Sequence, residues 1–254
     1  MKIIALVKQV PDTGGERKLD ASGLLDRNAS ERIIDEINER SLEIALRYKD
    51  SNKQAEVVLM TMGPADATST LRKGLSMGAD SAIHIVDDNL AGSDAVRTSA
   101  VLAAALKDTG FDLVVAGNES TDGRGGVVPA MLAERLGVAQ LTHLNSVELS
   151  EGSVSGVRST DAGTLTAHAD LPAVISITEI AAEPRFPNFK GIMTAKKKPV
   201  TVLSLADLGV ETPPAQSVVV SATERPARTG GKKVIDDGTA ATELAEFLAA
   251  ERLI

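Results

Sequence analysis

The residues best suited to chemistry lie in the segment GNESTDGRGGVV, residues 117–128. It follows a strand-like apolar run and leads into a helix-like run. Its glycines permit backbone conformations that side chains forbid, and successive amides at a helix amino terminus attract anions. Ser120, Thr121 and Asp122 add hydroxyls and a carboxylate suited to ribose or phosphate-linked groups. The segment indicates a nucleotide-binding loop.

Spacing alone favours nucleotide binding only slightly over a structural turn. The loop is neither GxxxxGK[ST] nor a GxGxxG in the first βα turn, and it has no phosphate-binding lysine of the first kind. Phosphate hydrolysis is therefore disfavoured.

Other side chains give little support for catalysis. His84, His143 and His168 have no metal-ligand spacing and are interpreted as core or surface histidines. The acids Asp35, Glu36 and Glu39 are explained as helix-start residues that favour the helix dipole. No serine occupies a GxSxG turn. We therefore expect a carrier or binding protein and not an enzyme with its own nucleophile.

Residues 183–198, EPRFPNFKGIMTAKKK, hold two of the four phenylalanines of a chain that is only 2% aromatic. An aromatic residue on a Pro-flanked polar loop is typical of a partner-docking anchor. The alternative, a small local core under the loop, is equally favoured for Phe186 and less so for Phe189. The lysine run 196–198 is either a solvated face or a means of steering acidic partners.

Composition limits the class of protein. The formal net charge of −8 disfavours a general nucleic-acid binder, and the absence of cysteine excludes disulfides and thiolate metal sites. The start, MKIIALVKQV, is too short for a signal-peptide core, and no apolar run reaches the roughly 18 residues of a spanning helix. We expect a cytoplasmic location.

These candidate residues need a scaffold, and the first half of the chain alternates strand-like and helix-like runs. Such alternation predicts an α/β fold with a mostly parallel, doubly wound sheet. The expected strands are 3–10, 56–62, 81–86 and 111–116. The expected helices are 39–49, a second one through Leu71 that closes in a left-handed cap at Gly78, 93–107 with Ser93 as N-cap, and 127–136.

The pattern of strand-like and helix-like runs changes after residue 140. Short runs at 145–149, 153–158, 164–169 and 173–178 predict an antiparallel extension of the sheet. Residues 183–198 are expected to form an irregular loop. We predict a nucleotide-binding domain over 1–206 and a C-terminal arm over 207–254, with a helix at 242–253, that packs on a partner subunit.

The region from Val157 to Val200 resembles the signature region of electron transfer flavoprotein beta subunits. The matching motifs are LPAV at 171–174, PR at 184–185 and AKKK at 195–198. VKQVPD, MGPADA, LSMGAD and ADLGV match elsewhere, in order, so that the resemblance covers nearly the whole chain.

The resemblance implies a fold like that of universal stress proteins and a heterodimer with an alpha subunit that carries FAD. It also implies AMP in this subunit, or a second FAD in electron-bifurcating members. The implied nucleotide contacts are Leu6, Asp35, Glu36, Ile37, Asn38, Met62, Gly117, Asn118, Glu119, Ser120, Thr121, Asp122, Gly123, Arg124, Gly125, Gly126, Val127 and Val128. Two positions depart from many relatives: Asp35-Glu36 replaces Asn-Pro, and the loop keeps only Asp122 of its aspartates. The residues alone leave the choice between AMP and FAD open.

The same resemblance implies a docking loop at 183–198 with Phe189 as its protruding anchor. Implied partners are acyl-CoA dehydrogenases and related flavoenzymes as electron donors and a membrane quinone oxidoreductase as acceptor. The docking residues would be Pro184, Arg185, Phe186, Phe189, Ile192, Met193, Lys196, Lys197 and Lys198. A stand-alone regulator of the universal-stress type accounts for the sheet and the glycine loop, but not for the docking loop or the arm. An ATP-using ligase is disfavoured, because no phosphate-binding signature follows the first strand.

Overall fold

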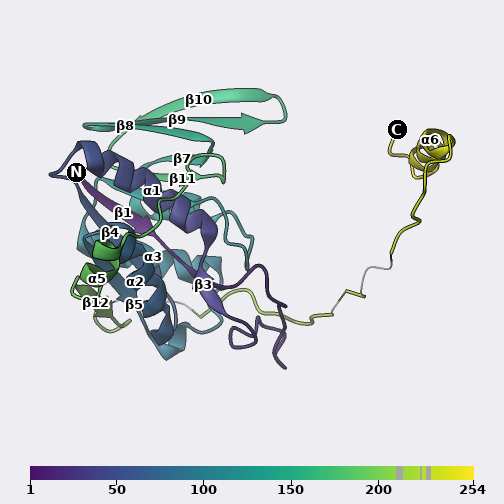
Figure 1. Cartoon of the computed structure of the whole chain (residues 1–254). Helices are drawn as coiled ribbons and strands as arrows, with labels where there is room; N and C mark the ends of the chain where they lie inside the picture. Colours follow the sequence, from purple (N-terminus) through teal and green to yellow (C-terminus); the bar gives the residue numbers. More distant parts are fainter. Residues whose placement is uncertain (210–213, 224, 227–229) are drawn as a thin grey trace. The chain divides into compact units, whose positions relative to one another are not determined.

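The computed structural model describes residues 1–209, 214–223, 225–226 and 230–254 (Figure 1). The chain forms two compact units, Met1–Val220 and Ser221–Ile254. The predicted arm, 207–254, and the end of the ADLGV motif include residues outside the described part.

A seven-stranded parallel sheet forms the centre of the first unit. Its order is β12-β5-β4-β1-β6-β11-β7. The strands are β1 (Lys2–Leu6), β4 (Glu56–Met62), β5 (Ser81–Ile85), β6 (Leu113–Gly117), β7 (Ala139–Leu144), β11 (Ala173–Ile177) and β12 (Val200–Leu203). The chain winds outward from β1 to β4 and β5 and then returns to β6 on the other side of β1. The carboxyl ends of β1 and β6 therefore form the switch point where ligands bind in such sheets.

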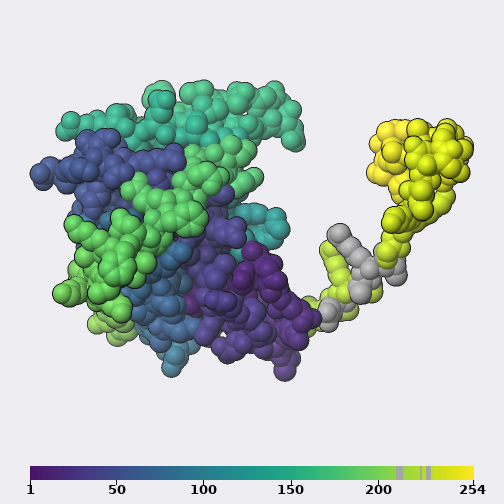
Figure 2. Space-filling view, viewed as in Figure 1, coloured from purple at the N-terminus to yellow at the C-terminus, as the bar shows by residue number. Residues whose placement is uncertain are grey.

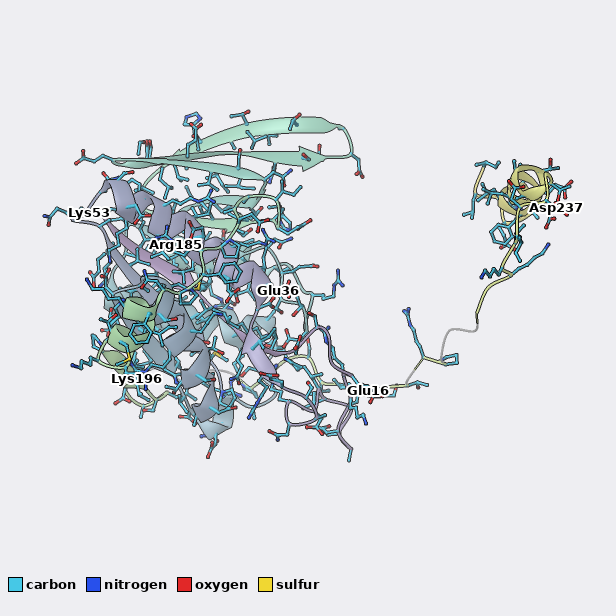
Figure 3. All side chains as sticks on the ribbon, viewed as in Figure 1. Glu16, Glu36, Lys53, Arg185, Lys196 and Asp237 are labelled. Carbon is cyan, nitrogen blue, oxygen red and sulfur yellow. The ribbon has the colours of Figure 1, made fainter. Side chains whose placement is uncertain are left out.

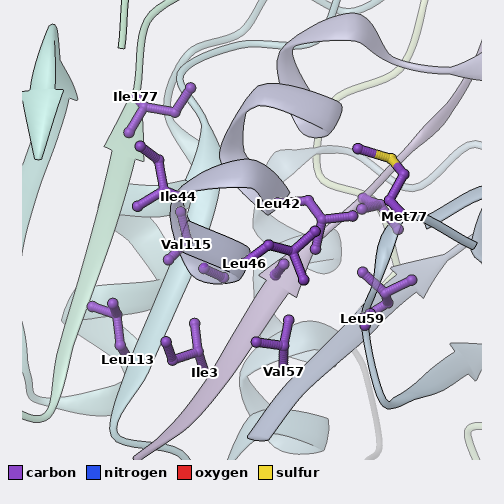
Figure 4. Close-up of a cluster of buried hydrophobic side chains, with 14 of the residues drawn as sticks. Ile3, Leu42, Ile44, Leu46, Val57, Leu59, Met77, Leu113, Val115 and Ile177 are labelled. Carbon is purple, nitrogen blue, oxygen red and sulfur yellow. The ribbon is translucent and has the colours of Figure 1, made fainter. Parts of the chain in front are cut away.

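Helices cover both faces of this sheet, as predicted for a doubly wound fold. Side chains alternate along β1: Ile3 belongs to one buried cluster, and its neighbour Ile4 belongs to the other. The first cluster includes Leu42 and Leu46 of α1 (Glu36–Ser51), which pack over β1 and β4 (Figure 4), and side chains of α2 (Thr68–Met77). The second includes side chains of α3 (Ala95–Thr109) and α4 (Val128–Leu136).

The antiparallel strands form a sheet of their own and do not extend the main one. Its order is β10-β9-β8, with β8 at Ser146–Ser150, β9 at Ser153–Thr160 and β10 at Gly163–Asp170. The run at 173–178, predicted as part of the extension, is instead β11, which pairs in parallel with β6 and β7. All five residues of β11 are buried, as expected for a parallel strand with both faces covered.

Several helix ends differ from the predictions. Asp94, not Ser93, caps α3, because its carboxylate accepts the Arg97 amide at 2.8 Å. Gly137 closes α4 in the left-handed conformation, whereas Gly78 ends α2 with a φ of 143° and a ψ of −6°, outside that region. The C-terminal helix α6 spans Ala240–Ala250, with both ends earlier than predicted.

The segment 183–198 is more ordered than predicted. It contains the short helix α5 (Phe189–Ala195), which begins after Pro187. Asn188 caps it by accepting the Gly191 amide at 2.7 Å. Near the start of the chain, β2 (Gln9–Pro11) pairs with β3 (Arg32–Ile34), and an isolated bridge joins Leu19 to Leu25. None of the helices in the described residues is long and apolar enough to cross a membrane.

Candidate functional site

The glycine loop begins at the switch point, where the end of β6 meets the start of α1. A Cβ added to Gly117 would lie 2.6 Å from Cγ2 of Ile37, so only glycine permits this close approach. The Asn38 amide oxygen accepts the backbone N–H of Lys8, two residues after β1, at 2.8 Å. The structure therefore brings together three of the predicted segments: the end of β1, residues 35–38 and the loop 117–128.

Asp35 is fully buried beneath this loop. Its Oδ2 accepts the backbone N–H of Thr121 at 2.8 Å and the Thr121 hydroxyl at 3.3 Å. Among the described residues, its Oδ1 has no hydrogen-bond partner. Burial raises the pKa of Asp35, and the Thr121 hydrogen bonds oppose that rise only in part. Asp35 thus fixes the loop, a role that was not predicted, while it also stands at the start of α1 as expected.

Asp35→Asn is expected to raise the melting temperature of the purified chain by about 2–4 °C at pH 7, or about 1 kcal/mol. The pKa of Asp35 is higher in the folded chain than in the unfolded chain. As the pH rises from the unfolded to the folded value, ionisation of Asp35 therefore lowers the free energy of unfolding. Below about pH 4 both states are protonated, and the difference between the two chains disappears. Thermal unfolding at pH 4 and pH 7 measures this; a lower melting temperature for the variant at pH 7 contradicts it.

Asp122 is the centre of a charged network. Its Oδ1 lies 2.7 Å from the Lys8 ammonium, and its Oδ2 lies 3.0 Å from the Arg27 guanidinium. Only 2% of its side chain is exposed. Burial would raise the pKa of Asp122, but Lys8 and Arg27 outweigh this and hold it well below its usual range. Its oxygens are thus paired with cations, and its predicted contact with a nucleotide stays a prediction.

The sequence analysis missed three cations beside the loop. Lys8 also donates to the Ser120 hydroxyl at 3.2 Å, and Arg17 donates to the Thr121 carbonyl at 2.6 Å. Lys8 lies two residues after the buried strand β1, so strand ends were a usable signal. Arg17 and Arg27 lie in a polar turn region that gave no such signal. With Arg124, they place four cations around one loop of an acidic chain.

The remaining predicted contacts do not all lie at the glycine loop. Glu119 pairs with Arg124 at 3.2 Å. Gly125 has open space where a Cβ would project, and Gly126 has a φ of 64°. Others end strands or begin a helix: Leu6, Met62, Val127 and Val128. Glu36 lines a shallow hollow of about 370 Å³ with Arg32, Ser69, Thr70 and Lys73, whose lining includes none of residues 117–128.

His84 is buried next to the Thr68 hydroxyl, 3.2 Å from its Nδ1. Burial lowers the pKa of His84 and favours its neutral form. Of the two alternatives expected from the sequence, core or surface, the structure shows that His84 is a core residue.

The segment 183–198 exposes its aromatic side chains. Phe186 is 92% exposed and Phe189 81%, and Ile192 and Met193 are about half exposed. Figure 2 shows the segment, in green, on the surface of the first unit. A local core beneath the loop, the alternative from the sequence, is wrong for both phenylalanines.

The charged residues of this segment divide into two kinds. Lys196 and Lys197 are exposed. Lys198 instead donates to the carbonyls of Leu75 and Ala79 at the end of α2, and burial lowers its pKa. Arg185 lies against α1 (Figure 3), and hydrogen bonds to Glu43 raise its pKa.

A family model described as the electron transfer flavoprotein domain matches residues 22–208. The electron transfer flavoprotein subunit beta of Mycobacterium tuberculosis (strain H37Rv) is 50% identical, with 99% of each chain covered. That of Megasphaera elsdenii is 33% identical over both full lengths. The caffeyl-CoA reductase-Etf complex subunit CarD of Acetobacterium woodii is 33% identical, covering 99% of this chain and 97% of that protein. This chain belongs to the electron transfer flavoprotein family, among its beta subunits.

Proposed function

We propose that this chain pairs with an alpha subunit that holds most of the FAD contacts, and that the heterodimer works in the cytoplasm. The heterodimer carries electrons from acyl-CoA dehydrogenase-type flavoenzymes to a membrane quinone oxidoreductase. The supporting observation is the exposed apolar projection of residues 186–193 on a protein of this family. FAD supplies the redox chemistry. This chain contributes binding and docking.

The exposed projection suits a carrier that must bind and release several partners. Phe186 and Phe189 offer two aromatic anchors, a residue type that is enriched at protein interfaces. Lys196 and Lys197 lie nearby in the chain and would attract an acidic rim on the partner. A small anchored contact favours rapid release, because affinity differences between related complexes lie mostly in the dissociation rate.

The arm is proposed to pack on the alpha subunit. Among the described residues of its own unit, α6 has no buried residue, although Leu244 and Phe247 are large and apolar. Exposed apolar side chains spaced three residues apart lie on one face of a helix, and such a face is usually covered by a partner.

We propose AMP as the ligand of the glycine loop, bound by the residues that the resemblance implies. Asp35 Oδ1 is a buried acceptor without a partner among the described residues, and it would accept from a nucleotide hydroxyl or amine. Lys8, Arg17 and Arg27 supply positive charge for a phosphate. Gly125 leaves room for a ligand to approach the backbone.

A second FAD in place of AMP is the alternative. The relative from Acetobacterium woodii belongs by name to a caffeyl-CoA reductase-Etf complex, which suggests that some relatives serve other redox systems. Its 33% identity to this chain is below the 50% of the mycobacterial beta subunits.

The nucleotides that heat releases from the heterodimer test the ligand. We expect one FAD and one AMP. Gly125→Ala should lower AMP at least tenfold without changing the melting temperature of the nucleotide-free protein, because the added Cβ would meet no protein atom within 4 Å and would take the space proposed for the ligand. Two FAD per heterodimer would mean that the glycine loop binds FAD and not AMP. The absence of any nucleotide beyond the FAD of the alpha subunit would overturn the proposed site.

A further inference from the structure

The residue immediately before Phe186 is attached to α1 by both its backbone and its side chain. The Arg185 guanidinium donates to Glu43 from Nε at 2.7 Å and from an Nη atom at 3.0 Å. The backbone N–H of Arg185 donates to the same carboxylate at 3.2 Å. A bidentate charged pair fixes orientation as well as distance. The direction of the backbone just before Phe186 is therefore fixed.

Glu43 cannot itself be a partner contact. Only 6% of its side chain is exposed, and Arg47 also pairs with it at 3.1 Å. A buried carboxylate needs such cations, because its charge has lost most of its water. The outer part of Arg185 also reaches Asp50 at 2.8 Å, and 57% of the Asp50 side chain is exposed.

Other bonds hold the same end of the segment on α1. Arg40 donates to the Ala182 carbonyl at 2.7 Å, and Arg47 donates to the Glu183 carbonyl at 3.3 Å. Two arginines of α1 therefore hold the backbone just before Arg185.

The opposite end is held on α2. Arg72 donates to the carbonyls of Ala195 at 2.7 Å and Lys198 at 2.8 Å. A Cβ on Gly191 would lie 2.3 Å from the Ser76 carbonyl, so α5 packs directly on the end of α2. Between these two attachments, residues 186–193 project with their exposed apolar side chains.

We propose that Arg185 and Glu43 act as positioning residues, which hold the projection of residues 186–193 in its docking orientation before the electron donor arrives. The proposal rests on the docking function proposed above. Binding is weaker when a segment must be ordered on contact, so loss of the pair should weaken docking without altering electron transfer in the bound complex. Arg185 was expected from the resemblance to touch the partner, and this inference gives it an internal role.

The test is a set of heterodimers carrying Glu43→Gln, Arg185→Lys or both. Reduction of the heterodimer by a purified acyl-CoA dehydrogenase and its acyl-CoA substrate gives KM and the limiting rate. We expect either single variant to raise KM about fivefold with an unchanged limiting rate, and the double variant to do no more than either single one. Asp50→Asn, which removes only the exposed partner of Arg185, should leave KM within about twofold of wild type.

Hydrogen exchange provides the second readout. Amides of residues 183–191 should exchange faster in Glu43→Gln and Arg185→Lys, while those of 68–77 stay unchanged. If Arg185→Lys raises KM and Glu43→Gln does not, Arg185 contacts the donor directly and the inference is wrong. Unchanged exchange in both variants also overturns it. If Glu43→Gln does not fold, the two variants Arg185→Lys and Arg47→Gln are compared instead. The KM for the donor and the hydrogen exchange of residues 183–191 are measured for both.

Phe189→Ala separates this inference from the function on which it rests. If Phe189→Ala raises KM and the Glu43 and Arg185 variants do not, docking at this segment stands and the positioning role is lost. If Phe189→Ala has no effect, the docking function itself fails.

Discussion

Phe189→Ala is expected to raise the KM of the heterodimer for an acyl-CoA dehydrogenase about 30-fold, with bound FAD and the limiting rate unchanged. Truncating a buried anchor at an interface centre typically costs about 2 kcal/mol or more, and about 1.4 kcal/mol corresponds to tenfold. Phe189 is 81% exposed, so its side chain contributes little to the fold of the chain itself. The loss should therefore appear in docking alone, measured by steady-state reduction at varied heterodimer concentration.

Phe247→Ala is the matched control. It removes the same side chain from α6, where Phe247 is 58% exposed and is proposed to face the alpha subunit. Assayed as an intact heterodimer, it should keep the KM for the donor. Equal KM values for wild type and Phe189→Ala would instead move the docking site away from this segment.

The parallel sheet was predictable because its strands are buried on both faces. The run Glu56–Met62 is nearly all apolar and stops at Gly63-Pro64, and the structure has β4 with those same ends. By contrast, β7 is half exposed and was not predicted. The parallel pairing of β11 was missed because an apolar run does not reveal its neighbours, which only the complete sheet determines.

Helix α5 was missed because Pro184, Pro187 and Gly191 argue against a helix. Yet Pro187 lies outside it, and Asn188 is a standard N-cap residue whose signal was overlooked. Gly191 is explained by the close packing of α5 on α2. The exposure of Phe189 was favoured from the sequence and is confirmed, whereas for Phe186 the sequence left exposure and a local core equally favoured.

In the glycine loop, composition predicted the place but not the contacts. Asp35 and Thr121 are 86 residues apart in the chain, and Lys8 and Asp122 are 114 apart. Such pairs form only when β1 and β6 lie side by side at the switch point. A local sequence pattern does not encode this long-range arrangement. Asp122 shows this best, because its sequence neighbours suggested a ligand contact and its distant neighbours occupy its oxygens.

Asp122→Asn is accordingly expected to lower stability and nucleotide occupancy together. Breaking a buried ion pair costs about 3–5 kcal/mol; because 40% of Lys8 and 37% of Arg27 are exposed, we expect about 2 kcal/mol here. That corresponds to a melting temperature lower by about 4–8 °C for a chain of this size. AMP released by heating should also fall, since Lys8 and Arg27 would no longer be held beside the loop.

The pH dependence identifies the carboxylate as the cause. The folded-state pKa of Asp122 is depressed, so its contribution is fully present above the unfolded value of about 4 and is lost as the pH falls through the folded value. The difference in melting temperature should therefore shrink as the pH falls below about 4. Glu16→Gln, which removes an exposed pair with Lys18 in the neighbouring segment, should change nothing measurable.

Hydrogen exchange distinguishes lost anchoring from a general loss of stability. Arg27 is attached to Asp122, and Arg17 donates to the next residue back, so both tie residues 12–31 to the loop. Asp122→Asn should speed exchange at 12–31 and 117–126 more than in β4, which lies outside the network. A variant with wild-type stability and AMP content would contradict this and show that Lys8 and Arg27 hold the loop without their shared carboxylate.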